Sequence, residues 1–253
     1  MSGRRDLFVI LLCLVGVMAV LFHRSFGSDE ILFNNDFSFG TGMALGEHGL
    51  GIYTGYWQDL NWLGGASVTP PPCVSSGFGL TLSELLGPTG FFRFFPPISL
   101  MILGLSAWLF FRQLGFGSAA CALGGLAAAL NMNTFSNACW GQTSRGMTLA
   151  MTFLALAALT SRATQRAWLR HALAGLAIGM GVMEGFDTGA IYSLYVAAFA
   201  FFWAWQQEGS ATQKFFRATG RVALMAACAV FIAAHILISL FNTQVKGVVG
   251  TQQ

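Results

Sequence analysis

Residues 172–205 read ALAGLAIGMGVMEGFDTGAIYSLYVAAFAFFWAW, and this stretch decides how many times the chain crosses a membrane. As one helix it would be about 50 Å long, whereas the hydrocarbon core of a bilayer is about 30 Å thick. Four polar or helix-breaking residues interrupt it: Glu184, Gly185, Asp187 and Gly189. Both flanks are basic, and basic flanks stay in the cytoplasm, which demands an even number of crossings. The stretch is therefore predicted to form two spans, 171–184 and 189–206, with a tight turn outside.

The composition predicts a membrane environment for the whole chain. The 253 residues include 13 Lys and Arg and 10 Asp and Glu, so only 9% are charged, while 55% are hydrophobic. Soluble domains average about 25% charged residues, and disordered chains are poor in apolar ones. The net charge of +3 is too small and scattered to indicate a nucleic-acid partner. We therefore predict an all-α polytopic membrane protein.

Five further apolar runs complete a single membrane domain, 1–253, of about seven transmembrane helices with a large outer loop at 24–95. These runs are 7–23, 96–111, 114–131, 146–161 and 222–241. Arg4 and Arg5 keep the N-terminus cytoplasmic, and the first run is interpreted as an uncleaved anchor because no small-residue cleavage site follows it. The second span is expected to start at Pro96-Pro97, since proline suits a first helical turn.

This topology places most basic residues on the inner side of the membrane and most acidic residues on the outer side. Nine of the 13 basic residues lie inside, which supports the orientation, and eight of the 10 acidic residues lie outside. Small residues indicate close helix packing at Gly175-x-x-x-Gly179 and Gly181-x-x-x-Gly185. The excess of outer carboxylates draws attention to the outer face as the place for chemistry.

Candidate catalytic residues lie in SDEILFNNDFSFG, residues 28–40, directly after the first span. Asp29, Glu30 and Asp36 fall within eight residues near the membrane surface, beside aromatic side chains. Such a carboxylate could act as general base on a hydroxyl, or hold a divalent cation that binds a phosphate. The alternative is that these acids cap helices and solvate a loop.

Six other residues are candidates for substrate binding: Arg93, Arg145, Glu184, Asp187, Trp57 and Asp59. The two arginines are outer cations that could meet a lipid phosphate or pair with carboxylates. The acidic pair sits at the outer end of a short span, where ionisable residues usually face a cavity, or it simply forms the turn. The tryptophan and its neighbouring aspartate belong to an aromatic-rich segment, YTGYWQDLNWLGG, that could stack on sugars or lie in the interface.

Motifs for other chemistries are missing from the sequence. It contains no P-loop, dinucleotide-binding fingerprint, zinc signature or nucleophile elbow. No spacing of Cys and His residues predicts a metal site. These observations argue against an ATPase, a soluble-nucleotide enzyme and a serine hydrolase.

The order of parts resembles the GT-C superfamily of membrane glycosyltransferases, in which one span is followed by a large outer loop with an acidic motif and the core has seven spans. Here Asp29-Glu30 stands at the place of that motif, with Asp36 as a second candidate. Further stretches resemble YfhO-like bacterial membrane proteins: NNDF from 34, WQDLNWLGG from 57, LSAWLFFRQLGF from 105 and AAALNMNTFSNACW from 127. Members of that group are much longer, so we expect this chain to be truncated.

The resemblance implies transfer of a sugar from a polyprenyl-phosphate donor to a cell-envelope glycan or lipid, on the outer side of a bacterial inner (cytoplasmic) membrane. One carboxylate of the acidic motif would be the catalytic base, and a divalent cation is a candidate cofactor. Two alternatives stay open. One is a transporter or flippase of a lipid-linked or small polar substrate, using Glu184, Asp187 and His235; the other is a non-catalytic membrane assembly subunit.

Overall fold

A computed structural model of the chain describes residues 2–27, 30–32, 56–58, 65–67, 74–161 and 166–241. Helices make up nearly all of these residues: α1 (Ser2–Leu21), α4 (Val74–Leu114), α5 (Ser118–Leu130), α6 (Met132–Cys139), α7 (Thr143–Thr160), α8 (Ala167–Glu184), α9 (Phe186–Trp205) and α10 (Ala211–Leu240). Two short strands, β1 (Tyr56–Gln58) and β2 (Gly65–Ser67), pair antiparallel, with Trp57 opposite Ala66. The predicted helical class is confirmed.

Three helical segments are long and apolar enough to cross a membrane: Thr81–Leu114, Phe186–Trp205 and Ala211–Ala234. Helix α5 is apolar but shorter. This finding is consistent with a membrane protein. Each of the seven predicted spans overlaps a helix, with bounds that differ, and the count of seven crossings stays a prediction.

The predicted break in the 172–205 stretch is found at Gly185. Helix α8 ends at Glu184 and α9 begins at Phe186, so a single extended residue (φ −148°, ψ 94°) separates them. The two helices fold back on each other so closely that a Cβ placed on Gly189 would lie 2.5 Å from the Gly181 carbonyl oxygen. The absence of a side chain at Gly189 therefore allows the tight turn. The sequence predicted a turn here from its polar residues but not this close contact.

The expected helix start at Pro96 is wrong. Helix α4 begins at Val74, is interrupted by a kink at Gly87 (φ 68°, ψ 169°), resumes at Pro88 and continues through Pro96 and Pro97. Pro88 follows the kink and takes a first-turn position, where its missing N–H costs nothing. At Pro96 the helix persists in a buried setting, where the Ser99 hydroxyl donates to the Pro96 carbonyl oxygen at 2.7 Å. Residues 74–95 of the predicted outer loop are thus helical.

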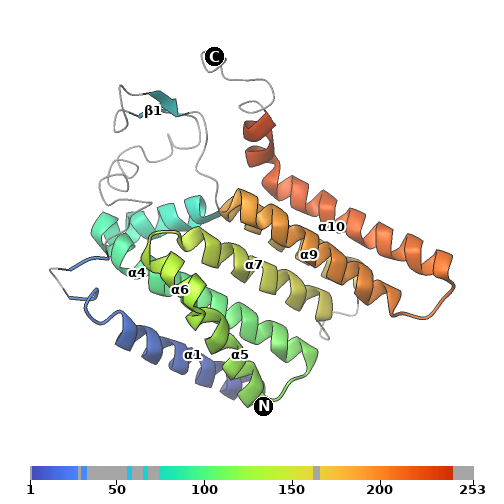
Figure 1. The fold of residues 1–253 in the computed structure, drawn as a ribbon, viewed down its shortest axis with the longest axis horizontal. Coiled ribbons are helices and arrows are strands. Elements are labelled where there is room, and N and C mark those ends of the chain that lie inside the picture. The colour runs from blue at the N-terminus through green and yellow to red at the C-terminus, as the bar shows by residue number, and fades with distance from the viewer. Residues whose placement is uncertain are drawn as a thin grey trace.

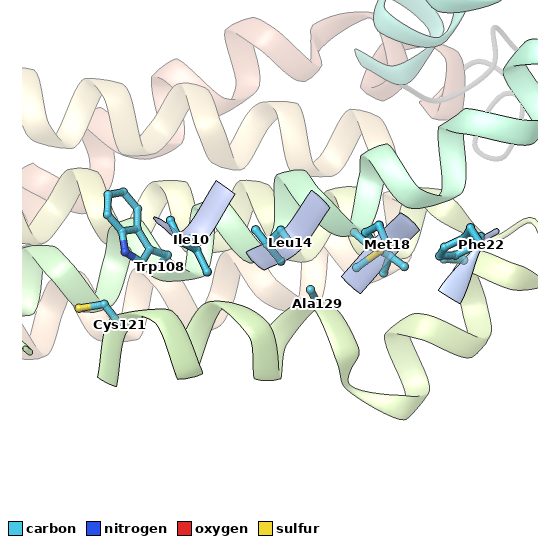
Figure 2. Packing of buried hydrophobic residues seen from close by; sticks show 9 residues of the cluster. Ile10, Leu14, Met18, Phe22, Trp108, Cys121 and Ala129 are labelled. Carbon is cyan, nitrogen blue, oxygen red and sulfur yellow. The ribbon is translucent and has the colours of Figure 1, made fainter. Parts of the chain in front are cut away.

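The helices form two packed groups. The N-terminal cluster joins α1, α4, α5 and α6 around Ile10, Leu14, Met18, Phe22, Leu100, Trp108, Cys121, Ala129 and Ala138. Figure 2 shows Ile10, Leu14 and Met18 of α1, together with Phe22 just after it, in a row facing α5 and α4. The C-terminal cluster joins α7, α8, α9 and α10 around Ala155, Leu159, Ala174, Ala177, Ile178, Val196, Ala200 and Met225. Helix α4 packs against α7 and so connects the two groups.

The bundle has two chemically different ends. Figure 1 shows the N-terminus and the α4–α5 and α9–α10 connections at one end, and the starts of α4 and α9 at the other. The first is named the basic end, after Arg112, Arg166, Arg170, Lys214, Arg217 and Arg221. The second is named the mixed-charge end, after Arg24, Glu30, Arg93, Arg145, Glu184 and Asp187.

Candidate functional site

The mixed-charge end holds every predicted site residue whose side chain the structure describes. Helix ends or breaks position four of them: Arg93 six residues after the α4 kink at Gly87, Arg145 in the first turn of α7, and Glu184 and Asp187 on either side of the α8–α9 break. Glu30 follows the end of α1. The alternating direction of the helices therefore gathers residues that are far apart in sequence.

Glu184 is the most enclosed charged group, with 1% of its side chain exposed. It is the last residue of α8, and the neighbouring Gly185 leans on α7, because a Cβ there would lie 2.8 Å from the Thr148 hydroxyl. Thr148 donates to Ser144 O at 2.9 Å and lies 3.3 Å from Gly181 O. A buried carboxylate is costly and is commonly functional. Glu184 is thus enclosed where the helix breaks, and its role stays a prediction.

Asp187 differs from Glu184 although only two residues separate them. It is exposed, in the first turn of α9. A carboxylate at this position interacts favourably with the positive end of the helix dipole. Its placement fits the turn-forming interpretation, so the two acids of the pair lie in different environments.

Arg93 and Arg145 present cations at the same end. Arg93 is half-buried, and its neighbour Phe94 stacks on Phe26 with ring centroids 5.4 Å apart, which fixes the segment after α1 beside this turn of α4. Arg145 is exposed at the start of α7, a helix with no acidic residue in its first turn and no side-chain hydrogen bond from its N-cap residue. A cation beside a helix N-terminus favours an anionic ligand. Arg145 therefore suits a phosphate-bearing ligand, and Arg93 adds a second cation at this end of the bundle.

Glu30 pairs with Arg24, a residue that sequence reasoning did not select. The Arg24 Nη2 and Nε atoms donate to the two carboxylate oxygens at 3.1 and 3.2 Å. This hydrogen bond and the charge of Glu30 raise the pKa of Arg24 above its ordinary value. The pair is exposed, so it orders this segment only weakly. The two residues are six apart in an irregular segment, and no periodicity could have indicated their contact.

Three predicted residues, Asp29, Asp36 and Asp59, lie outside the described residues. Trp57 lies in β1, the central residue of that strand. The roles proposed for these four residues stay predictions.

Within the part of the chain that the structure describes, no three His, Cys, Asp or Glu residues gather closely enough to hold a metal ion. The mixed-charge end offers instead cations for an anionic ligand and carboxylates for proton transfer. In comparisons with known proteins, no family model, no curated protein and no solved structure matches this chain.

Proposed function

We propose that this chain is a membrane glycosyltransferase module of the GT-C type, similar to YfhO-like proteins. It would transfer a sugar from a polyprenyl phosphate to a cell-envelope glycan or lipid on the outer side of the inner membrane. One observation carries the proposal: Arg93, Arg145 and Glu184 lie at the same end of the bundle as Glu30, the described acid of the 28–40 segment. Cations suited to a donor phosphate thus share one end of the bundle with Glu30, and this supports the proposal.

The chemistry assigns a different task to each charged group. Asp29 or Asp36 removes the proton of the acceptor hydroxyl, and the resulting oxygen attacks the anomeric carbon of the donor sugar. The bond from that carbon to the phosphate oxygen breaks, and the polyprenyl phosphate leaves with the electron pair. Arg93 and Arg145 stabilise the negative charge that develops on the leaving phosphate. Glu30 assists, either by orienting the acceptor or by holding a divalent cation.

The test measures sugar transfer in vesicles by the full-length protein, with a radiolabelled sugar on polyprenyl phosphate as donor. Loss of a general base lowers rates by about 10²–10⁴-fold, so Asp29→Asn or Asp36→Asn should do so. Arg145→Gln should raise KM for the donor. Glu208→Gln, an exposed acid at the basic end, is the matched control and should leave transfer unchanged.

The buried position of Glu184 favours a second candidate function, a proton-coupled transporter or flippase. An ionisable side chain enclosed at a helix break is typical of substrate and proton pathways. The two candidates separate in the same vesicles. If both Asn variants leave transfer intact while Glu184→Gln abolishes proton-coupled uptake, the transferase proposal fails and the transporter replaces it.

A further inference from the structure

Three arginines come together at the basic end, between α8 and α10. Arg170 lies in the first turn of α8, and Arg217 and Arg221 lie one turn apart on α10. Gly175 of α8, five residues past Arg170, packs against the backbone of Met225 on α10, four residues past Arg221. The two helices therefore bring Arg170 beside Arg221 and its neighbour Arg217, and the charges of both act on Arg221. Arg170 and Arg221 are half-buried, and Arg217 is exposed. Like charges repel, so this arrangement is costly unless an anion joins it.

The three guanidinium groups donate hydrogen bonds to uncharged oxygen atoms of the protein. Arg221 Nη2 donates to Gln207 Oε1 at 3.0 Å, Arg217 Nη1 to the backbone oxygen of Glu208 at 3.2 Å, and Arg170 Nη1 to the backbone oxygen of Ser161 at 3.3 Å.

These bonds leave donors of the cluster unused. Arg170 Nε is buried and has no hydrogen-bond partner in the described structure. The ion pair between Arg24 and Glu30 lies at the opposite end of the bundle. The cluster is thus short of negative charge and of at least one acceptor, and a phosphate would supply both.

The surroundings of the cluster indicate where such a phosphate comes from. Large aromatic side chains stand exposed beside it, with exposed fractions of 58% for Trp168, 42% for Trp205 and 70% for Phe216. Exposed aromatic rings next to arginines are typical of the boundary between a membrane and water. The candidate membrane span of α9 ends at Trp205 and that of α10 begins at Ala211, so both spans have one end beside the cluster. The headgroup layer of the bilayer is therefore the neighbouring source of phosphate.

We propose that Arg170, Arg217 and Arg221 form a binding site for the phosphate of an anionic phospholipid, bridging α8 and α10 at the membrane surface. Guanidinium groups bind phosphate oxygens in pairs, and basic recesses between membrane helices suit lipid headgroups. The bound lipid holds together two helices that already approach closely through Gly175 and Gly179. The site stabilises the bundle and is independent of sugar transfer.

The test compares the thermal midpoint of the detergent-purified protein with added phosphatidylglycerol, phosphatidylcholine, inorganic phosphate or glycerol phosphate. We expect phosphatidylglycerol alone to raise the midpoint in a saturable manner. Arg221→Gln and Arg170→Gln should each weaken the apparent affinity by about tenfold or more, because charge-assisted hydrogen bonds are lost. Arg5→Gln, an exposed arginine of α1 at the same end, removes the same charge and should keep the response.

Two results would overturn the proposal. One is an unchanged response to phosphatidylglycerol in both cluster variants, which would assign the stabilisation to the bilayer as a whole. The other is equal stabilisation by inorganic phosphate or glycerol phosphate, which would assign the cluster to a soluble anion. If a half-buried variant does not fold, Arg217→Gln answers the same question, because that side chain is exposed.

Discussion

Helix α1 in the N-terminal cluster and the α8–α10 pair in the C-terminal cluster pack by different means. In the N-terminal cluster, long side chains fill the space between helices: Ile10 and Leu14 of α1 are fully buried, and Trp108 of α4 nearly so. In the C-terminal cluster, glycines bring backbones together. A Cβ on Gly179 would lie 2.6 Å from the Ala229 carbonyl oxygen, and one on Gly175 would collide with the Met225 carbonyl oxygen.

The difference teaches which contacts tolerate change. Apolar burial drives association weakly inside a bilayer, so close van der Waals contact decides which helices pair. Long side chains can shift to other rotamers when a neighbour changes, but a backbone carbonyl against a glycine cannot yield in that way. We therefore expect the α8–α10 contact to be the less tolerant of added atoms and the N-terminal cluster to be more sensitive to atoms removed.

The largest effect is expected from filling the α8–α10 contact. The double variant Gly175→Leu, Gly179→Leu should lose on the order of 5 kcal/mol of folding free energy, because one overpacking substitution costs about 1–3 kcal/mol. The measurement is the thermal midpoint of monodisperse protein in detergent. Gly16→Ala on α1 is the control, since a Cβ there has no neighbour within 4 Å. A double variant as stable as the control would refute close backbone packing.

A smaller loss is expected from opening the N-terminal cluster. Leu14 is 0% exposed, so Leu14→Ala should leave a cavity and cost about 2–5 kcal/mol. The adjacent Val15 is 45% exposed, and Val15→Ala should change the thermal midpoint little. Equal shifts for the two variants would mean that α1 does not present the face toward α4 that the structure describes.

The smallest effect tests both packing modes within one helix pair. A Cβ on Gly125 would lie 2.7 Å from the Gly104 carbonyl oxygen of α4, whereas one on Gly124 would meet the Phe111 ring, a side chain that can turn. Gly125→Ala should therefore cost about 1–3 kcal/mol and Gly124→Ala less than about 1 kcal/mol. The measurement is the thermal midpoint of each variant. A larger loss for Gly124→Ala than for Gly125→Ala would contradict the distinction between the two packing modes.

Much of the helical layout could be predicted from apolar runs and their interruptions. The break at Gly185 could be found because one helix of that length does not fit a bilayer. The start of α4 could not, because Pro96 looks like a first-turn residue by itself, and only its burial within a longer kinked helix shows otherwise. The predicted close packing at Gly175 and Gly179 is confirmed, but the sequence could not name α10 as their partner.

The candidate site divides in the same way. Residue type and position relative to the spans were enough to select Arg93, Arg145 and Glu184. The sequence could not distinguish the buried Glu184 from the exposed Asp187, because both lie at the same break. Nor could it show that Arg24 binds Glu30 or that Arg170 approaches Arg221, since these contacts depend on how irregular segments and separate helices come together.

By itself the sequence determined the helical class, the apolar environment and the sorting of charges toward two ends, because these follow from composition and from lengths along the chain. Only the tertiary structure decided which helices touch, which carboxylate is enclosed, and which arginines share one anion-poor cluster. The physical reason is that partner choice depends on shape complementarity in three dimensions, such as a glycine of α8 meeting a carbonyl group of α10. Local patterns record the apolar face of each helix but not the surface that will cover it.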